Sequence, residues 1–321
     1  MNKFGIAAPS KMMGTLLAAL LSGMTLAQEA TTATPIKGVI AANTPIQLVK
    51  EGFDGTEGPL PQADGGLLFT ENRAGRVIRV LPDGTTSVWL ASSGNANALA
   101  ASPHGDMVAA LTGDKPGIGV LKLDAPPRFL VEAFEGKPFG RPNDLVVSRR
   151  NDVYFSDPGV AVAGSPPPRT AVFRLSASGE LSLLTDAIGR PNGVALSPDE
   201  RTLYVADTAG EWVVAFDLDR QGAAKAHRNF ARLSGFRQTE TGPSSGADGL
   251  AVDAKGRLYV ATTVGVQVFS PRGEALGVIA LPKAPQNLAF AGKGRDTLYV
   301  VGRGSVYRIA TETRGPRRAG K

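Results

Sequence analysis

From residue 57 onward the chain repeats one pattern, in which a polar residue precedes a short apolar run, a turn and a second apolar run. Six copies are present, and their leading residues are Glu57, Asn97, Asn143, Asn192, Asp248 and Asn287. Successive leading residues are separated by 40, 46, 49, 56 and 39 positions. This spacing is typical of the four-stranded blades of a β-propeller rather than of helical repeats.

The apolar runs have the composition of strands. Residues 203–205 and 258–260 are both Leu-Tyr-Val, and turns rich in Gly, Asp, Asn and Pro flank such runs. Most copies continue with two further short strands, for example residues 172–175 and 181–184. No long stretch after the N-terminal leader shows a 3.6-residue apolar period. The pattern therefore predicts an all-β fold, a six-bladed β-propeller with four-stranded blades.

The last copy has room for only three strands. Residues 37–50 form an extended stretch without a repeat of their own, and we expect part of this stretch to supply the fourth strand of the sixth blade. Such ring closure by an N-terminal strand would cover two sheet edges. The longest insertions, residues 157–169 and 234–247, are predicted to be lids over one face of the ring.

The N-terminus has the features of a secretory signal peptide. Lys3 and Lys11 precede the mostly apolar run 12–27, and small residues, Thr25 and Ala27, occupy the −3 and −1 positions of a cleavage site. The run is shorter than the roughly 20 residues of a spanning helix. We therefore expect a periplasmic or secreted protein with no membrane anchor after cleavage. The predicted division is a signal peptide (1–27), a flexible segment (28–36), a single propeller domain (37–310) and a basic disordered tail (311–321).

Charge and cysteine content exclude several functions. The net charge is +6, but residues 1–27 and 314–321 together carry six basic and no acidic residues. The body between them has no net charge and lacks the basic surface that nucleic-acid binding requires, so no nucleic-acid partner is expected. The absence of cysteine excludes disulfides, a thiolate nucleophile and a thiolate metal site. The sequence gives no indication of oligomeric state.

The leading residues suggest a metal site. The first strand of each propeller blade lines the central channel, so these two carboxylates and four amides should converge on one axis. Their oxygens would be unsatisfied without a cation or water, and they suit a hard cation such as Ca²⁺. Repeat geometry alone explains Asn97 and Asn287, which we leave out of the metal set. We expect one divalent ion, Ca²⁺ in the first place, with Zn²⁺, Mg²⁺ or Mn²⁺ as alternatives.

Four short segments resemble the signature segments of the gluconolactonase family, which includes the senescence marker protein. They are Glu-Gly-Pro from residue 57, Arg-Pro-Asn-Asp from residue 141, Arg-Pro-Asn-Gly from residue 190 and Asp-Gly from residue 248. The resemblance covers roughly residues 50–310. It implies a six-bladed propeller that holds one divalent metal in its channel and hydrolyses lactones.

The resemblance also implies roles for individual residues. Glu57, Asn192 and Asp248 match metal ligands, and Asp248 also matches the proposed general base. Asn143 matches an asparagine beside the metal that either ligates it or binds substrate, and Arg141 matches an arginine that contacts substrate. In such a site the metal would activate water and polarise the lactone carbonyl.

Other mechanisms find less support in the sequence. Residues 242–246 match the nucleophile string G-x-S-x-G, but no helix follows and the chain has only two histidines, His104 and His227. No nucleotide-binding loop stands between a strand and a helix. The sequence thus predicts an exported metal-dependent hydrolase of a sugar lactone or similar cyclic ester. The alternatives are a non-catalytic propeller that binds a ligand or protein around a structural metal, and a hydrolase of organophosphate or aryl esters.

Overall fold

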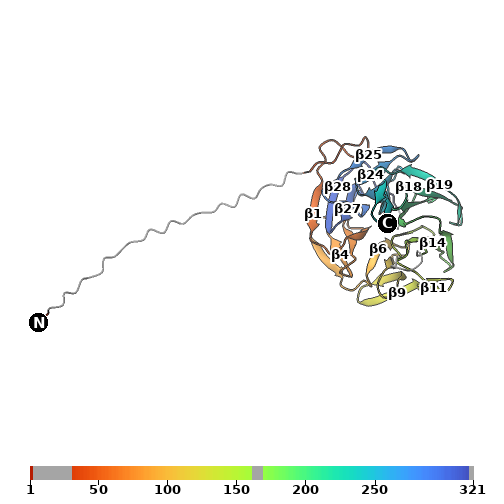
Figure 1. Cartoon of the computed structure of the whole chain (residues 1–321), viewed down its shortest axis with the longest axis horizontal. Coiled ribbons are helices and arrows are strands. Elements are labelled where there is room, and N and C mark those ends of the chain that lie inside the picture. The colour runs from red at the N-terminus through yellow and green to blue at the C-terminus, as the bar shows by residue number, and fades with distance from the viewer. Residues whose placement is uncertain (3–30, 161–168, 318–321) are drawn as a thin grey trace.

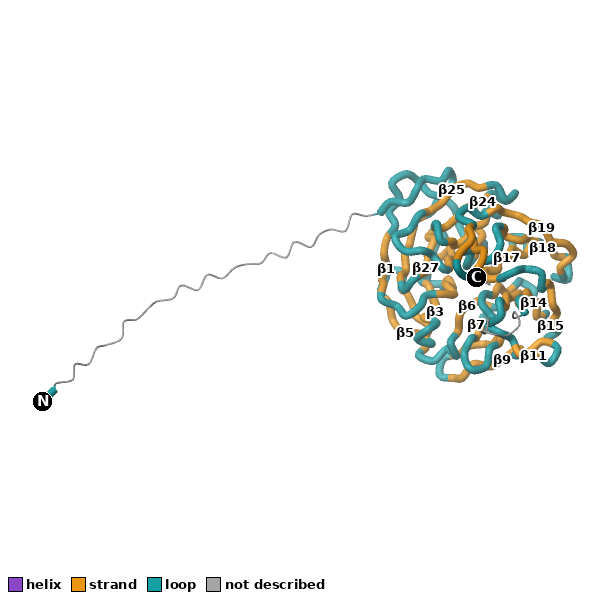
Figure 2. Tube along the Cα trace, viewed as in Figure 1, coloured by secondary structure: helices purple, strands orange, loops and turns teal. Residues whose placement is uncertain are grey.

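The computed structural model describes residues 1–2, 31–160 and 169–317. These residues form strands and loops without a helix (Figure 2). Six four-stranded antiparallel sheets surround a central axis as the blades of a propeller (Figure 1). The predicted all-β, six-bladed architecture is confirmed.

The first five blades each use four strands that follow one another in the chain. Blade 1 contains β2 (Glu57–Pro61), β3 (Leu67–Glu71), β4 (Arg76–Val80) and β5 (Thr86–Leu90). Blade 2 contains β6 (Ala96–Ala101), β7 (Met107–Leu111), β8 (Gly117–Lys122) and β9 (Ala125–Val131). Blade 3 contains β12 (Leu145–Val147), β13 (Val153–Asp157), β14 (Ala171–Leu175) and β15 (Leu181–Thr185). Blade 4 contains β16 (Pro191–Leu196), β17 (Thr202–Asp207), β18 (Trp212–Leu218) and β19 (Ala224–Arg232). Blade 5 contains β22 (Leu250–Val252), β23 (Leu258–Thr262), β24 (Gly265–Phe269) and β25 (Ala275–Ile279).

The sixth blade joins the two ends of the chain. It contains β26 (Asn287–Ala291), β27 (Thr297–Gly302), β28 (Ser305–Ala310) and, as its outermost strand, β1 (Gln47–Glu51). Leu48 of β1 lies opposite Tyr307 of β28. The predicted ring closure by an N-terminal strand is therefore confirmed.

The hydrophobic core is divided among the six interfaces between neighbouring blades. Each of the six clusters of buried apolar side chains draws its strand residues from two adjacent blades. Between blades 2 and 3, for example, the rings of Phe139, Phe155 and Phe173 pack with centroids 5.2–5.3 Å apart. Because burial of apolar surface supplies most of the favourable free energy of folding, this ring of interfaces fixes the positions of the six inner strands.

Residues 31–46 lie against the interface between blades 5 and 6. Ile36, Val39 and Ile40 are buried in the cluster that these blades share, and Thr32 forms a β-bridge with Pro45. We expected residues 28–36 to be flexible. The described part of that segment is instead packed on the propeller, because its apolar side chains find partners far along the chain.

The C-terminal segment also differs from the expectation of a disordered tail. Thr313 donates its hydroxyl to Asp253 (3.0 Å), and the backbone N–H of Gly315 donates to the carbonyl of Arg295 (2.8 Å). These bonds hold residues 311–317 against blades 5 and 6, and the composition of the tail gives no sign of them. Residues 318–321 lie outside the described residues.

Two hairpins leave the blades. They are formed by β10 (Ala133–Phe134) with β11 (Lys137–Pro138), and by β20 (Arg237–Thr239) with β21 (Gly242–Ser244). The second hairpin lies within the insertion 234–247. Residues 161–168 of the other insertion are outside the described part, so both lids stay predictions. The predicted signal peptide lies, apart from residues 1–2, outside it as well. In the described ranges no helix could cross a membrane.

Candidate functional site

The inner strands β2, β6, β12, β16, β22 and β26 all begin at the same end of the channel, and a cavity of about 610 Å³ opens there. We call this cavity the site mouth. All five residues to which the sequence analysis gave a role line it, namely Glu57, Arg141, Asn143, Asn192 and Asp248. The structure thus brings together groups from blades 1, 3, 4 and 5.

Close packing of the inner strands explains part of the sequence signature. The backbone N–H of Gly193 donates to the carbonyl of Asp248 (3.2 Å), and that of Gly249 donates to the carbonyl of Gln286 (2.7 Å). A Cβ atom on Gly193 would collide with the Asp248 carbonyl, and one on Gly249 would collide with Asn287. Glycine after the channel residue therefore lets one blade bond directly to the next.

Asn192 presents an unsatisfied oxygen at the site mouth. Its Nδ2 donates to the hydroxyl of Thr208 (3.3 Å), and that hydroxyl donates to the carbonyl of Ala247 (2.6 Å). The Oδ1 atom of Asn192 is buried and has no hydrogen-bond partner among the described residues. A buried acceptor without a donor is costly, and a cation would remove that cost.

Glu57 is almost fully buried, with 5% of its surface exposed. Asn287 donates its Nδ2 to Glu57 Oε2 (3.0 Å), and Gln286 donates its Nε2 to Oε1 (3.4 Å). Asn287 also accepts the N–H of Leu288 (2.9 Å). Asn287 therefore has a structural role that orients Glu57.

Asn97 is likewise engaged in bonds within the ring. Its Nδ2 donates to the backbone carbonyl of Asn143 (2.9 Å), while its Oδ1 accepts from Asn72 (2.8 Å). These contacts give Asn97 a structural role between blades, in line with its omission from the metal set.

Carboxylates at the ends of second strands hold the loops that carry two arginines. Asp157 accepts the backbone N–H groups of Gly140 and Arg141, both at 2.8 Å. Asp207 accepts the backbone N–H of Arg190 at 3.0 Å. These two carboxylates and Thr208 were not among the predicted site residues, although a hydroxyl and an acid recur near the end of the second strand and could have indicated them.

The site mouth is richer in charge than the sequence analysis recognised. Besides Arg141 it is lined by three more arginines, Arg73, Arg190 and Arg303, and by the carboxylates of Asp54, Glu57 and Asp248. All four arginines are exposed, whereas Glu57 is buried. No three His, Asp or Glu side chains of the described residues gather closely enough to hold a metal ion. An ion at the site mouth would thus need amide oxygens as well as carboxylates.

The residues of the alternative Ser/His mechanism lie elsewhere. His227 is on the outer strand β19, where its ring packs on Phe216 with centroids 5.4 Å apart. His104 is in the turn after β6, at the other end of the inner strands. Ser244 is on the hairpin strand β21. None of the three lines the site mouth.

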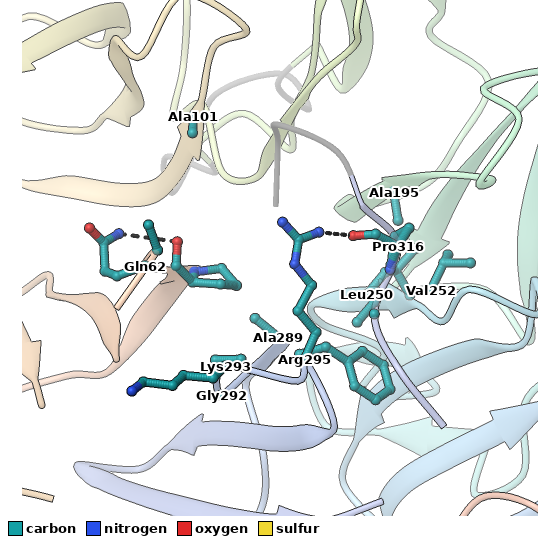
Figure 3. Close-up of a pocket in the computed structure, with 16 residues that line it drawn as sticks. Gln62, Ala101, Ala195, Leu250, Val252, Ala289, Gly292, Lys293, Arg295 and Pro316 are labelled. Carbon is teal, nitrogen blue, oxygen red and sulfur yellow. Dashed lines mark hydrogen bonds between the residues drawn. The ribbon is translucent and has the colours of Figure 1, made fainter. Parts of the chain in front are cut away.

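A second cavity, of about 380 Å³, lies where the inner strands end, and we call it the far mouth (Figure 3). Small and apolar side chains, among them Ala195, Val252 and Ala289, line it. Arg295 extends across the cavity and donates to the carbonyl of Pro316 in the C-terminal segment (Figure 3). None of the predicted site residues is here.

A six-bladed propeller that gathers carboxylate, amide and guanidinium groups at one mouth of its channel defines a protein with a polar ligand site on the propeller axis. The chain belongs to the SMP-30/Gluconolactonase/LRE-like region family, whose model matches residues 55–303. The family resemblance seen in the signature segments is thereby confirmed.

Known proteins of similar sequence and structure agree with this family. The chain is 31% identical to a gluconolactonase of Zymomonas mobilis subsp. mobilis, over 92% of this chain and 89% of that protein. It is 30% identical to a 6-deoxy-6-sulfogluconolactonase of Pseudomonas putida, over 73% of this chain and 78% of that protein. A solved gluconolactonase from Xanthomonas campestris matches with a TM-score of 0.74 and 26% identity, over 89% of this chain and 99% of that one.

Proposed function

We propose that this protein is a lactonase-type hydrolase that opens the ring ester of a sugar lactone or a similar cyclic ester. The observation that carries the proposal is the site mouth, where a buried oxygen of Asn192 without a donor lies in one cavity with Arg141 and the carboxylates of Glu57 and Asp248. The gluconolactonases and the 6-deoxy-6-sulfogluconolactonase that the chain resembles support the same reaction class.

The residues of the site mouth fit a divalent cation. Glu57 and Asp248 provide carboxylate oxygens, Asn192 provides the unsatisfied amide oxygen, and Asn143 has a further amide at the same mouth. Such an all-oxygen donor set suits Ca²⁺ better than softer metals. A bound divalent cation would supply Lewis acidity to the lactone carbonyl and to the attacking water.

The protein's own groups would manage the protons and the orientation of the substrate. Asp248 accepts a proton from the attacking water as the water oxygen bonds to the carbonyl carbon. The ring C–O bond then breaks, and the proton passes to the departing oxygen, which becomes a hydroxyl group of the product acid. Arg141 holds a substrate hydroxyl or the carboxylate as it forms. Asn143 either adds its amide oxygen to the cation site or binds the substrate.

A hydrolysis screen tests the reaction class. Sugar lactones, aliphatic lactones, aryl esters and organophosphate esters are offered with and without added Ca²⁺, Zn²⁺, Mg²⁺ or Mn²⁺, and proton release is compared with the spontaneous rate. We expect catalysed hydrolysis of at least one lactone class, dependent on a divalent cation. Activity on none of the lactones would contradict the proposal and favour a ligand-binding propeller, and activity confined to the other esters would move the substrate class.

Thermal unfolding tests the cation site separately from activity. A cation that binds only the folded chain adds stability of about 2.7 kcal/mol at a hundredfold excess over its Kd. We expect a chelator to reverse this gain and Glu57→Gln to reduce it. Glu180→Gln, which alters an exposed carboxylate in the β14–β15 turn, is the matched control. An equal gain in Glu57→Gln and in wild type would refute the proposed ligand set.

A further inference from the structure

Four guanidinium groups surround the site mouth, and they come from four different blades. Arg73 lies in the β3–β4 turn and Arg303 in the β27–β28 turn. Arg141 lies in the loop before β12, and Arg190 directly precedes β16. In the part of the chain that the structure describes, none of these side chains forms an ion pair. Elsewhere on the propeller some exposed arginines, such as Arg228 and Arg232, pair with acids, whereas others, such as Arg272, pair with none of the described residues.

Arg141 and Arg190 are held in the same way. Each begins an Arg-Pro-Asn segment, and each has its backbone N–H bound by the carboxylate at the end of the second strand of its own blade. The proline that follows restricts the backbone further. Both side chains therefore leave the backbone from fixed points beside the channel asparagines. Arg190 repeats in blade 4 the placement that Arg141 has in blade 3.

Arg303 occupies a position that disfavours it. It forms a two-residue hairpin turn with Gly304 between the paired residues Gly302 and Ser305, and both turn residues have positive φ (51° and 74°). Such turns favour asparagine, aspartate or glycine at their first residue. An arginine there carries a conformational cost. Its backbone N–H donates to Gln286 (2.8 Å), so the turn is well defined. The turn therefore holds Arg303 at the site mouth in spite of this cost.

The charge at the site mouth is local. The body of the chain between the leader and the tail has no net charge, whereas the arginines of the site mouth outnumber its acids, which are Asp54, Glu57 and Asp248. Guanidinium groups bind carboxylate, sulfonate and phosphate oxygens with paired hydrogen bonds. One such group suffices for the carboxylate that any lactone yields, so three more arginines are available to a second anionic group.

We infer that the substrate of this site is an anionic lactone, one that carries a carboxylate, sulfonate or phosphate group on a carbon remote from the ring ester. The inference rests on the proposed function. Glu57 and the Oδ1 atom of Asn192 are buried, whereas the four arginines are exposed. A lactone therefore enters with its ester toward the ring of leading residues and its anionic group among the arginines. Arg190 and Arg303 then determine specificity without touching the reacting atoms.

Kinetics on matched substrates tests this inference. D-glucono-1,5-lactone is compared with its 6-phosphate and its 6-deoxy-6-sulfonate, and D-glucono-1,4-lactone is compared with D-glucaro-1,4-lactone as the carboxylate. For wild type we expect kcat/KM on an anionic lactone to exceed that on the neutral one about tenfold or more, the size of a charge-assisted hydrogen bond. Rising ionic strength should shrink this ratio. The best of the three anions identifies the group recognised.

Three variants connect the preference to the arginines. Arg190→Gln should lower the ratio severalfold, because kcat/KM falls more on the anionic lactone than on the neutral one, while the backbone bond to Asp207 remains. Arg303→Asn should lower the ratio and raise the melting temperature, because asparagine suits the turn. Arg272→Gln, in the β24–β25 turn at the opposite end of blade 5, should change neither quantity.

The outcomes separate this inference from the proposed function. If wild type hydrolyses the neutral lactone as well as the anionic ones, or if the ratio survives both Arg190→Gln and Arg303→Asn, the inference is overturned and the lactonase stands. If no lactone is hydrolysed, the proposed lactonase function is refuted. Calorimetry with gluconate and 6-phosphogluconate then tests whether the arginines still form an anion-binding site. Tighter binding of the phosphate, lost in Arg190→Gln, would support an anion site, and equal binding would overturn it.

Discussion

The two ends of the channel both bury polar side chains, but they satisfy them differently. Near the far mouth, the fully buried carboxylate of Asp253 accepts five hydrogen bonds. Their donors are the backbone N–H groups of Lys255 and Arg257 and the side chains of Arg257, Tyr259 and Thr313. At the site mouth, Asn192 Oδ1 is buried without a donor among the described residues. Burial of polar groups therefore does not mark a functional site by itself. Unsatisfied buried atoms also occur elsewhere, for example Arg257 Nη2 near the far mouth. Asn192 Oδ1 differs because it is an acceptor in the cavity that Glu57 and Asp248 also line, where a ligand could recover its free energy.

The largest expected effect is a loss of folding stability from a change near the far mouth. Asp253→Asn removes a buried charge that pairs with Arg257 at 2.7 Å, and loss of one partner of a buried pair costs about 3 kcal/mol or more. We expect denaturant unfolding to show this loss while kcat/KM of the folded fraction is retained. A change below about 1 kcal/mol would mean that the bonds to Asp253 contribute little.

The matched change at the site end should act on catalysis. Asp248→Asn keeps an oxygen for a cation but removes the proton acceptor, so we expect kcat to fall about 10²-fold or more. The gain in melting temperature on adding the cation should survive in part. Steady-state kinetics on the best lactone, with the cation saturating, measures the effect. Full activity would exclude Asp248 as the base.

A smaller effect on cation affinity should follow when Asn192 loses the hydroxyl that orients its amide. Thr208→Val removes the hydroxyl that accepts from Asn192 and donates to Ala247. Loss of a residue that orients a ligand typically costs about tenfold or more in metal affinity. Titration of the cation against melting temperature measures it, and Thr185→Val on the outer strand β15 is the control. Unchanged affinity would show that Thr208 does not orient Asn192.

The smallest effect concerns alkaline pH at the far end. Burial raises the pKa of Tyr259 above its usual value near 10, and the neighbouring Asp253 adds to the rise. The folded chain thus keeps this proton when the unfolded chain loses it, so the stability from this group is complete below pH 10 and declines as the pH rises further. Tyr259→Phe should cost about 1 kcal/mol at neutral pH and reduce the alkaline decline. Unfolding curves between pH 7 and 11 test both, and an unchanged decline would contradict the assignment.

Much of the fold followed from the sequence because it is repetitive. Each copy places its polar leading residue at or just before the start of an inner strand, so Glu57, Asn192 and Asp248 had to converge once six copies were counted. The stretch 37–50, which has no repeat of its own and includes most of β1, had only one incomplete blade to join. These inferences needed the period of the pattern and no knowledge of contacts.

Other features depend on which loops lie next to one another in the folded chain. Contacts between distant segments cannot be inferred from the residues of one segment. Arg303 looks like an ordinary charged turn residue until its hairpin is seen at the site mouth. Asp253 and Asp248 are five positions apart in one segment, yet one saturates its hydrogen bonds near the far mouth and the other lines the cavity. Thr313 lies in a segment whose composition suggested disorder. Arg190 could have been predicted from the sequence, since it begins an Arg-Pro-Asn segment just as Arg141 does.

The closure of the sixth blade by β1 and β28 affects how the chain folds during synthesis. During synthesis β1 appears first and its partner β28 last, so the outer strand of this blade must wait for almost the whole chain. Until then the growing chain exposes unpaired sheet edges, which invite pairing with other molecules. Pairing over such a distance along the chain also makes folding slow. Among the described strands β28 is the only partner of β1, so a copy that loses β28 cannot complete the sixth blade.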